Sequence, residues 1–182
     1  MPRPKPEPLT LPPDSVRYLQ GATAESRQFD FLIGEWDVAA TRYKPDGTVL
    51  FEYRASWTAQ YLNAGRMVLD DFKAQLPSGE ACSSYVTLRT YCETTGRWEM
   101  SGLAALQAAT PARWTGHQLD KDMLLEAVGT DPTGSTVRNR IRFFNIERDT
   151  FEWESQLSLD DGKTWTRAAT LLARRSARPL VA

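Results

Sequence analysis

Regularly spaced turn signals constrain this chain more than any other feature of its sequence. From Trp36 onward, short segments rich in β-branched and aromatic residues alternate, about every 10 to 15 residues, with turns that contain Gly, Pro, Asp or Asn. The turns lie at 45–47, 63–65, 77–79, 94–96, 131–134, 148–149 and 160–162. The segments between them predict ten strands, at 36–43, 49–61, 66–75, 81–91, 97–105, 113–118, 123–130, 136–145, 150–158 and 165–173.

The connections between these strands are too short to contain crossover helices, so consecutive strands should pair antiparallel in an up-and-down meander. A ten-stranded meander has two exposed edges unless it closes, and closure gives a barrel wide enough to hold a cavity. The sequence therefore predicts an all-β fold, a ten-stranded antiparallel barrel with one or two short N-terminal helices. At 182 residues, the chain is long enough for a single core.

The N-terminus differs from the rest because the first 13 residues hold six of the eleven prolines. Proline removes backbone donors and favours extended geometry, so we expect an arm that is disordered or that lies against a partner subunit in a homodimer. Short helices are expected at 14–20, capped by Asp14, and at 24–33. The predicted organisation is an arm with a short helix at 1–28, one barrel domain at 29–175 and a C-terminal tail at 176–182.

Alternation along the strands indicates which side chains face the barrel interior. In residues 49–61 the odd-numbered residues are apolar or aromatic, and from Glu52 onward the even-numbered ones are polar, so the odd set should point inward. The eighth and ninth strands carry opposing rows of charge, at Arg138, Arg140, Arg142, Glu152 and Glu154. These rows favour an exposed cross-strand charge ladder, with an anion site lined by the arginines as the alternative.

Charge and composition exclude several partners and sites. The 22 Lys and Arg residues balance 23 Asp and Glu, and a formal net charge of -1 gives no global attraction to nucleic acid or anionic lipid. No apolar run approaches the roughly 18 residues of a membrane span, and the N-terminus lacks the apolar block of a signal peptide, so we expect a cytoplasmic protein. Cys82 lies near the start of the predicted strand at 81–91 and Cys92 directly follows its end, so the two are too far apart for a disulfide. A single histidine and no Cys-x-x-Cys pair argue against a zinc site.

The segment FDFLIGEWDV at 29–38 resembles the opening of an uncharacterised bacterial family of lipocalin-like proteins. The resemblance covers most of the chain after residue 28. Its further matches are LRTY at 88–91, TGRW at 95–98 and FEW at 151–153. The resemblance implies an antiparallel barrel with one end plugged by the N-terminal helix.

Gly34-Glu35-Trp36 is similar to the Gly-x-Trp start of the broader calycin superfamily, which includes lipocalins, fatty-acid-binding proteins and nitrobindins. Independently of that likeness, Gly permits a close approach where helix becomes strand, and the indole of Trp36 can plug the barrel base. The resemblance implies that Arg167 or Arg174 of the last strand packs on Trp36. Nitrobindins bind haem through a histidine near the C-terminus. This chain has none there, so we expect no haem and no other cofactor.

The segment SLDDGKTW at 158–165 resembles the Asp-box hairpin of sialidase-type propellers. Ser158 and Asp160 should hydrogen-bond the backbone of a tight turn while Trp165 packs beneath it. A single copy predicts a folding device rather than sialidase activity.

Interior aromatic residues form the candidate ligand site. Tyr53, Trp57, Tyr61 and Met67 would give apolar walls, with Arg89 as a polar anchor, which is the composition of many small-molecule sites. The sequence therefore predicts binding of a hydrophobic or aromatic small molecule in the barrel, by a carrier or sensor. A barrel filled by its own large side chains is the alternative.

A second function class is a small tailoring enzyme, an isomerase, cyclase or dehydratase that moves a proton on its substrate. His117 is the first candidate for this proton transfer, since it is the only histidine and its ordinary pKa lies near neutrality. Asp70 and Asp71 are adjacent on a strand and point to opposite faces, so at most one lines the interior; we take Asp71 as the partner of His117 and Asp70 as the next candidate. No nucleophile elbow or Gly-rich phosphate loop is present.

Overall fold

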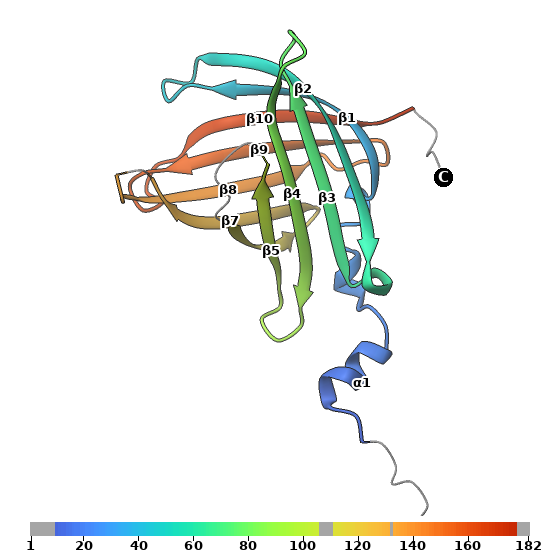
Figure 1. Cartoon of the computed structure of the whole chain (residues 1–182). Helices are drawn as coiled ribbons and strands as arrows, with labels where there is room; N and C mark the ends of the chain where they lie inside the picture. Colours follow the sequence, from blue (N-terminus) through green and yellow to red (C-terminus); the bar gives the residue numbers. More distant parts are fainter. Residues whose placement is uncertain (1–9, 106–110, 132, 178–182) are drawn as a thin grey trace, which may run out of the picture.

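The computed structural model describes residues 10–105, 111–131 and 133–177 and forms a closed barrel of ten antiparallel strands (Figure 1). Strands adjacent in the sequence pair with each other, and β1 also pairs with β10, which closes the barrel. The strands are β1 Gly34–Tyr43, β2 Val49–Leu62, β3 Met67–Gln75, β4 Ala81–Cys92, β5 Arg97–Ala104, β6 Ala112–Leu119, β7 Asp122–Thr130, β8 Thr136–Phe144, β9 Thr150–Ser158 and β10 Thr166–Arg175. The predicted fold is confirmed, and the strand bounds agree within two residues.

The helical segments are short, and all but one of those that the structure describes precede the barrel. Helix α1 spans Pro13–Leu19, and two 3-10 turns follow, η1 Ala24–Arg27 and η2 Asp30–Leu32. The continuous helix expected at 24–33 is therefore wrong. Phe29 interrupts it with a non-helical backbone (φ -100°, ψ 15°) and has its side chain fully buried in the core. The third 3-10 segment, η3 Asn63–Gly65, is the turn between β2 and β3.

Helix α1 projects from the barrel beside the turn between β2 and β3 (Figure 1). None of its residues is buried. Arg66, which directly follows that turn, fixes the helix by donating hydrogen bonds to the carbonyl oxygens of Arg17 at 2.5 Å and Tyr18 at 3.1 Å. Residues 1–9 of the expected arm and 178–182 of the expected tail lie outside the described residues.

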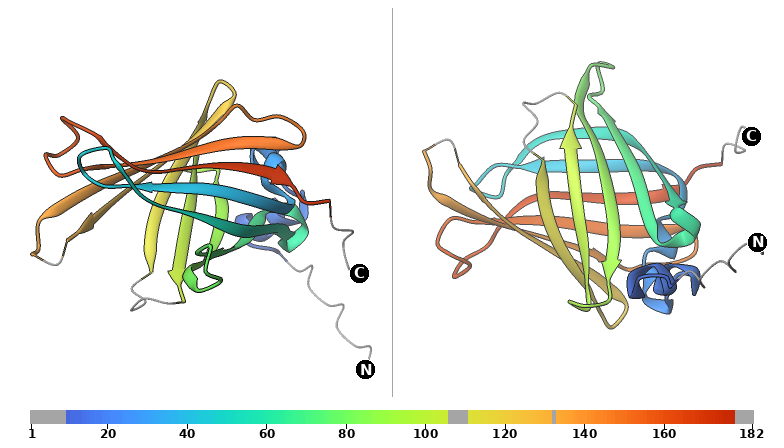
Figure 2. Two further views of the ribbon diagram at one scale, coloured as in Figure 1. Left: turned by 90° about the horizontal axis from the view of Figure 1, so that it is seen from above. Right: turned by 60° about the horizontal axis from the view of Figure 1, so that its bottom comes forward.

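One end of the barrel is closed by the residues that precede β1 (Figure 2). Phe29 and Leu32 are fully buried there, and the Phe29 ring meets Trp98 edge to face at 4.7 Å. The indole N–H of Trp36 donates to the Leu32 carbonyl at 2.8 Å, and its ring meets Phe151 at 4.7 Å. We call the cluster of Phe29, Leu32, Trp36, Trp98 and Phe151 the plug. Its aromatic contacts supply the burial that the short η1–η2 segment could not achieve alone.

Arg175 holds the plug to the last strand. Its guanidinium carbon lies 4.2 Å from the centre of the Trp36 ring, and Nη1 donates to the Ile33 carbonyl at 2.9 Å. Gly34 has a φ of +121°, a conformation that residues with a side chain rarely adopt, and its lack of a Cβ leaves room for that guanidinium. The expectation that Arg167 or Arg174 would stack on Trp36 is wrong, because Arg175 is the arginine that shares the inward face of β10 with Leu171 and Ala173.

The hairpin between β9 and β10 has the expected Asp-box geometry. The Ser158 hydroxyl donates to Asp160 at 2.8 Å and accepts from the Gly162 amide at 2.8 Å. Asp160 also accepts from the Thr164 amide at 2.8 Å, while the Trp165 indole donates to the Gly162 carbonyl at 3.0 Å. The side chains of Ser158, Asp160 and Trp165 therefore all serve the turn.

The arginines of β8 form ion pairs and hydrogen bonds on the outer surface of the barrel. Arg142 pairs with Asp122 at 2.6 Å and Arg138 with Asp161 at 2.7 Å, whereas Arg140 donates to Gln156. These contacts support the charge ladder over the anion site, because each arginine already has an acceptor. The partners differ from the expected glutamate row: Glu154, although opposite Arg142, pairs with Arg167 of β10 at 2.9 Å.

Candidate functional site

The barrel interior divides into a buried half beside the plug and a part-exposed half beyond it. In the buried half, Trp57, Val68, Trp98 and Phe143 are at most 5% exposed. A second set of interior-facing aromatic and aliphatic side chains is only partly buried, and we call this set the open half: Tyr53, Phe72, Tyr85, Trp114, Ile141 and Trp153.

Solvent reaches the open half from the end of the barrel opposite the plug. Arg42 and Ser83 share the inward face of their strands, since they pair with Phe51 and Ala74 in register, yet both are exposed. An interior that is exposed at one end, aromatic along its walls and sealed at its base has the features of a small-molecule site at a barrel mouth.

A buried ion pair lies between the two halves. Arg89 of β4 donates from Nε to Oδ2 of Asp70 on β3 at 2.7 Å, and both side chains are at most 5% exposed. The indole of Trp57 donates to the other Asp70 oxygen at 2.9 Å, and Arg89 also lies over the Phe29 ring at 4.8 Å. The carboxylate thus has a partner on each oxygen, which compensates for the loss of water around a buried charge.

Tyr85 supplies a hydroxyl group to the wall of the open half. Burial raises the pKa of Tyr85, while the hydrogen bond from the Trp114 side chain and the nearby Arg89 charge act in the opposite direction. The net shift is upward, so the phenol keeps its proton at neutral pH. A Cβ on Gly102 would collide with the Tyr85 ring, and the absence of a side chain at 102 therefore makes room for this tyrosine.

The residues predicted to bind ligand are divided by the structure. Tyr53 lies in the open half, and burial raises the pKa of its hydroxyl. Trp57 faces inward but belongs to the buried half, where its ring packs against Phe72 at 5.3 Å and Phe151 at 5.7 Å. The guanidinium of Arg89 is paired with Asp70 beneath the open half.

Tyr61 and Met67 lie away from the open half. Tyr61 donates its hydroxyl to Asp30 in the segment before β1, and burial with this hydrogen bond raises the pKa of Tyr61 to about 12. Met67 takes the outward parity of β3, opposite to Val68 and Asp70, and accepts a hydrogen bond from Asn63 at 2.9 Å. The assignment of Met67 to the interior is corrected, because register in a strand alternates residue by residue.

The two residues predicted for catalysis both lie on the outer surface. His117 is exposed on β6, with the buried Gly116 facing the opposite way. Asp71 points outward from β3 and pairs with Lys73 at 2.8 Å, whereas Asp70 points inward. The two therefore do not form an interior acid–base pair, and Asp70 is the acid that the barrel encloses.

Tyr85, Trp114 and Trp153 are interior residues that sequence reasoning did not assign to the site. The period-2 pattern could have found them, since Tyr85 shares its face with Arg89 on β4, and Trp114 alternates with Thr115 on β6. These three side chains come together only through the pairing of several strands, so the sequence of one strand cannot show that they are close in space.

No group of three or more potential metal-ligating side chains occurs within the described residues. Cys82 and Cys92, both on β4, are free thiols. Among the helices that the structure describes, none is long and apolar enough to span a membrane.

No protein-family model matches the chain, and no curated protein matches it. Among solved structures, 22 chains match. Rv2717c from M. tuberculosis aligns with a TM-score of 0.60 and 14% identity, over 85% of this chain and 99% of that chain. The S-type phycobiliprotein lyase CPES from Guillardia theta aligns with a TM-score of 0.59 and 12% identity, over 88% of this chain and 97% of that chain. At these identities the likeness establishes a shared fold alone, a closed antiparallel β-barrel.

Proposed function

We propose that the protein binds a hydrophobic or aromatic small molecule in the open half of the barrel, as a carrier or sensor. The observation that carries this proposal is the change in burial along the interior: aromatic walls are part-exposed on one side of the Asp70–Arg89 pair and sealed on the other. Burial of an aromatic ligand against such walls is favourable at about 25 cal/mol per Å² of apolar surface. Full burial of the side chains beside the plug supports the filled-barrel alternative for that half.

The walls also favour a ligand that presents a hydrogen-bond acceptor. An indole N–H can only donate, so the Tyr85 oxygen accepts from Trp114 and its own proton is available to another acceptor. Tyr85 is part-exposed to the interior, where a ligand would lie. A carbonyl, carboxylate or ether oxygen on the ligand would complete this chain of hydrogen bonds.

Two further observations support the proposal. The fold is shared with a phycobiliprotein lyase, and the mouth of a β-barrel is a recurrent position for ligand sites. The FDFLIGEWDV segment lies at the plug, which agrees with membership of the lipocalin-like family that this segment resembles. The enzymatic alternative has less support, because His117 does not face the interior.

Fluorescence titration with 1-anilinonaphthalene-8-sulfonate tests the proposal, since this probe becomes fluorescent in apolar sites. We expect saturable binding that Trp153→Ala weakens severalfold by removing a wall of the open half. Phe144→Ala is the matched control, because Phe144 lies on the outer face of the neighbouring strand, under Arg142. Equal binding by both variants would contradict the proposal. Independently of the titration, mass spectrometry of the native protein would identify any ligand that co-purifies.

A further inference from the structure

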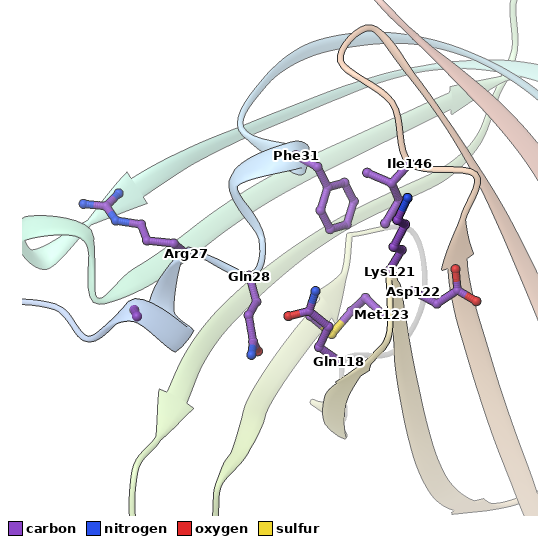
Figure 3. Close-up of a pocket in the computed structure, with 9 residues that line it drawn as sticks. Arg27, Gln28, Phe31, Gln118, Lys121, Asp122, Met123 and Ile146 are labelled. Carbon is purple, nitrogen blue, oxygen red and sulfur yellow. The ribbon is translucent and has the colours of Figure 1, made fainter.

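A pocket lies outside the barrel, at the plugged end (Figure 3). It has a volume of about 360 Å³ and is bounded by the segment before β1, the turn between β6 and β7, and the connection between β8 and β9. This volume is at the lower end of the range for small-molecule sites. The pocket is separate from the open half, because the buried plug lies between them.

The apolar wall of this pocket is fixed by the plug. Phe31 packs on its inner side against Phe143 and Phe151, with both ring centres at 5.6 Å, and contributes its remaining surface to the pocket. Met123, which is 1% exposed, and Ile146 complete this wall. A planar ligand lying against Phe31 would therefore meet a preformed surface rather than a mobile side chain.

Two glutamine amides give the pocket a defined hydrogen-bonding polarity. Oε1 of Gln28 accepts from the Trp98 indole at 2.9 Å, so the Gln28 NH₂ group is the part left to donate. Gln118 donates from Nε2 to the Asp120 carbonyl at 3.2 Å, so its Oε1 is left to accept. Figure 3 shows both side chains below the ring of Phe31. The pocket thus offers one neutral donor and one neutral acceptor beside an aromatic surface.

Most of the formal charge around the pocket is engaged elsewhere. The Arg27 guanidinium lies over the Tyr61 ring at 4.6 Å and points away from the pocket in Figure 3. The carboxylate of Asp122 pairs with Arg142 at 2.6 Å. Lys121, which is exposed, contributes the remaining charge at the rim.

We propose that this pocket binds a small aromatic carboxamide or lactam. The ring lies against Phe31, the amide oxygen accepts from the NH₂ group of Gln28, and the amide N–H donates to Oε1 of Gln118. A carboxylate could use the first contact but not the second, because it has no proton to donate. The pocket therefore selects the amide over the acid of the same shape.

NMR titration of the full chain with three matched probes tests this inference. Benzamide has both the acceptor and the donor, N,N-dimethylbenzamide has only the acceptor, and benzoate carries a negative charge. We expect benzamide to shift the side-chain NH₂ resonances of Gln28 and Gln118 and the methyl resonance of Met123, with a dissociation constant of about millimolar for so small a ligand. N,N-dimethylbenzamide should bind about three- to tenfold more weakly, which corresponds to one lost hydrogen bond.

Two variants locate the site. Gln118→Met removes the acceptor from an exposed position and should weaken benzamide by about three- to tenfold, to the affinity of the dimethylated probe. Gln60→Met, on the exposed outer face of β2, is the matched control and should leave binding unchanged.

Tighter binding of benzoate that is lost in Lys121→Met would overturn the proposal in favour of a charge-driven anion site. Absence of shifts at Gln28 and Met123 would overturn it outright. Binding of 1-anilinonaphthalene-8-sulfonate in the barrel is measured separately, so the proposal for the barrel and the proposal for this pocket can each be rejected without the other.

Discussion

At the residue scale, the Asp70–Arg89 pair stands out because it places two charges in the buried interior, where each charge needs the other as a partner. Sequence reasoning narrowed the buried acid to one of two adjacent aspartates, but the choice between Asp70 and Asp71 depends on strand register, which a pair of identical residues cannot reveal. It also selected Arg89 for a ligand contact, although its position beside Asp70 appears only when β3 and β4 pair. Two charged residues that are distant in the sequence therefore become partners only through the fold.

Breaking this ion pair should strongly destabilise the fold. Removal of one partner leaves an unpaired charge that is at most 5% exposed, so we expect Arg89→Met and Asp70→Asn each to cost about 3 to 5 kcal/mol in the free energy of unfolding. The double variant should cost less than the sum of the two, as urea denaturation can measure. Lys73→Met is the control, because Lys73 is exposed on the same strand and its pair with the half-buried Asp71 should be worth under about 1 kcal/mol. Additive costs would show that the two side chains act independently.

Gly102 should be intolerant of any side chain. A methyl group there would enter the space of the Tyr85 ring, so Gly102→Ala should displace that ring, cost about 1 to 3 kcal/mol and alter probe binding in the open half. Gly129→Ala is the matched control, since nothing lies within 4 Å of the position that its Cβ would take, and β7 should accept the change. Thermal denaturation and the fluorescence titration would check both variants, and equal behaviour would contradict the packing described for Tyr85.

At the element scale, strands were predictable because alternation and turn residues act locally, within one or two hairpins. The structure of segment 24–33 was not predictable from local signals. Its helical pattern competes with the burial of Phe29 in a core that is made by other elements. Met67 shows the limit at strand ends: Arg66 follows a turn of left-handed residues, and one residue of uncertainty there exchanges the inward and outward faces. Local signals thus define where a strand lies more firmly than which way its first residue points.

The β9–β10 hairpin should make stability depend on pH. Hydrogen bonds from Thr164 and Ser158 lower the pKa of Asp160 from 3.8 to about 2, so the folded state favours its ionised form. The stabilisation is therefore fully present above pH 3.8 and is lost as the pH falls toward 2. In urea denaturation between about pH 6 and 2, Asp160→Asn should lose less stability than the wild type, because it lacks this titration.

Asp14→Asn is the control for the hairpin prediction, because Asp14 is exposed on α1, which contains no buried residue. Its pH profile should match that of the wild type. Parallel profiles for all three proteins would mean that the Asp160 hydrogen bonds do not contribute to folding.

Deletion of residues 1–13 should leave the melting temperature nearly unchanged. The expected arm is rich in proline, and the helix that follows buries no side chain in the chain itself. Thermal denaturation of the shortened chain measures this directly. A large decrease would mean that the arm docks on another surface, and size-exclusion chromatography would then show whether that surface belongs to a second copy.

At the scale of the whole molecule, the barrel is asymmetric along its axis, with a plug at one end and part-exposed aromatic walls beyond the central ion pair. Closure and strand number followed from the sequence because ten strands with short connections have few other solutions. Which half stays open did not follow, because it depends on how side chains from all ten strands and the preceding segment share the interior volume. The same asymmetry separates the proposed barrel site from the pocket at the plugged end.

Filling the open half without removing any contact would test ligand binding in the barrel most directly. Ala55 faces inward, is part-buried and precedes Trp57 on the same face of β2, so Ala55→Phe would occupy the space proposed for the ligand. Ser56→Phe adds the same group to the exposed outer face of that strand. In titrations with 1-anilinonaphthalene-8-sulfonate we expect Ala55→Phe to abolish saturable binding and Ser56→Phe to bind like the wild type. Undiminished binding by a folded Ala55→Phe protein would place the ligand outside the open half and rule out the proposed barrel site.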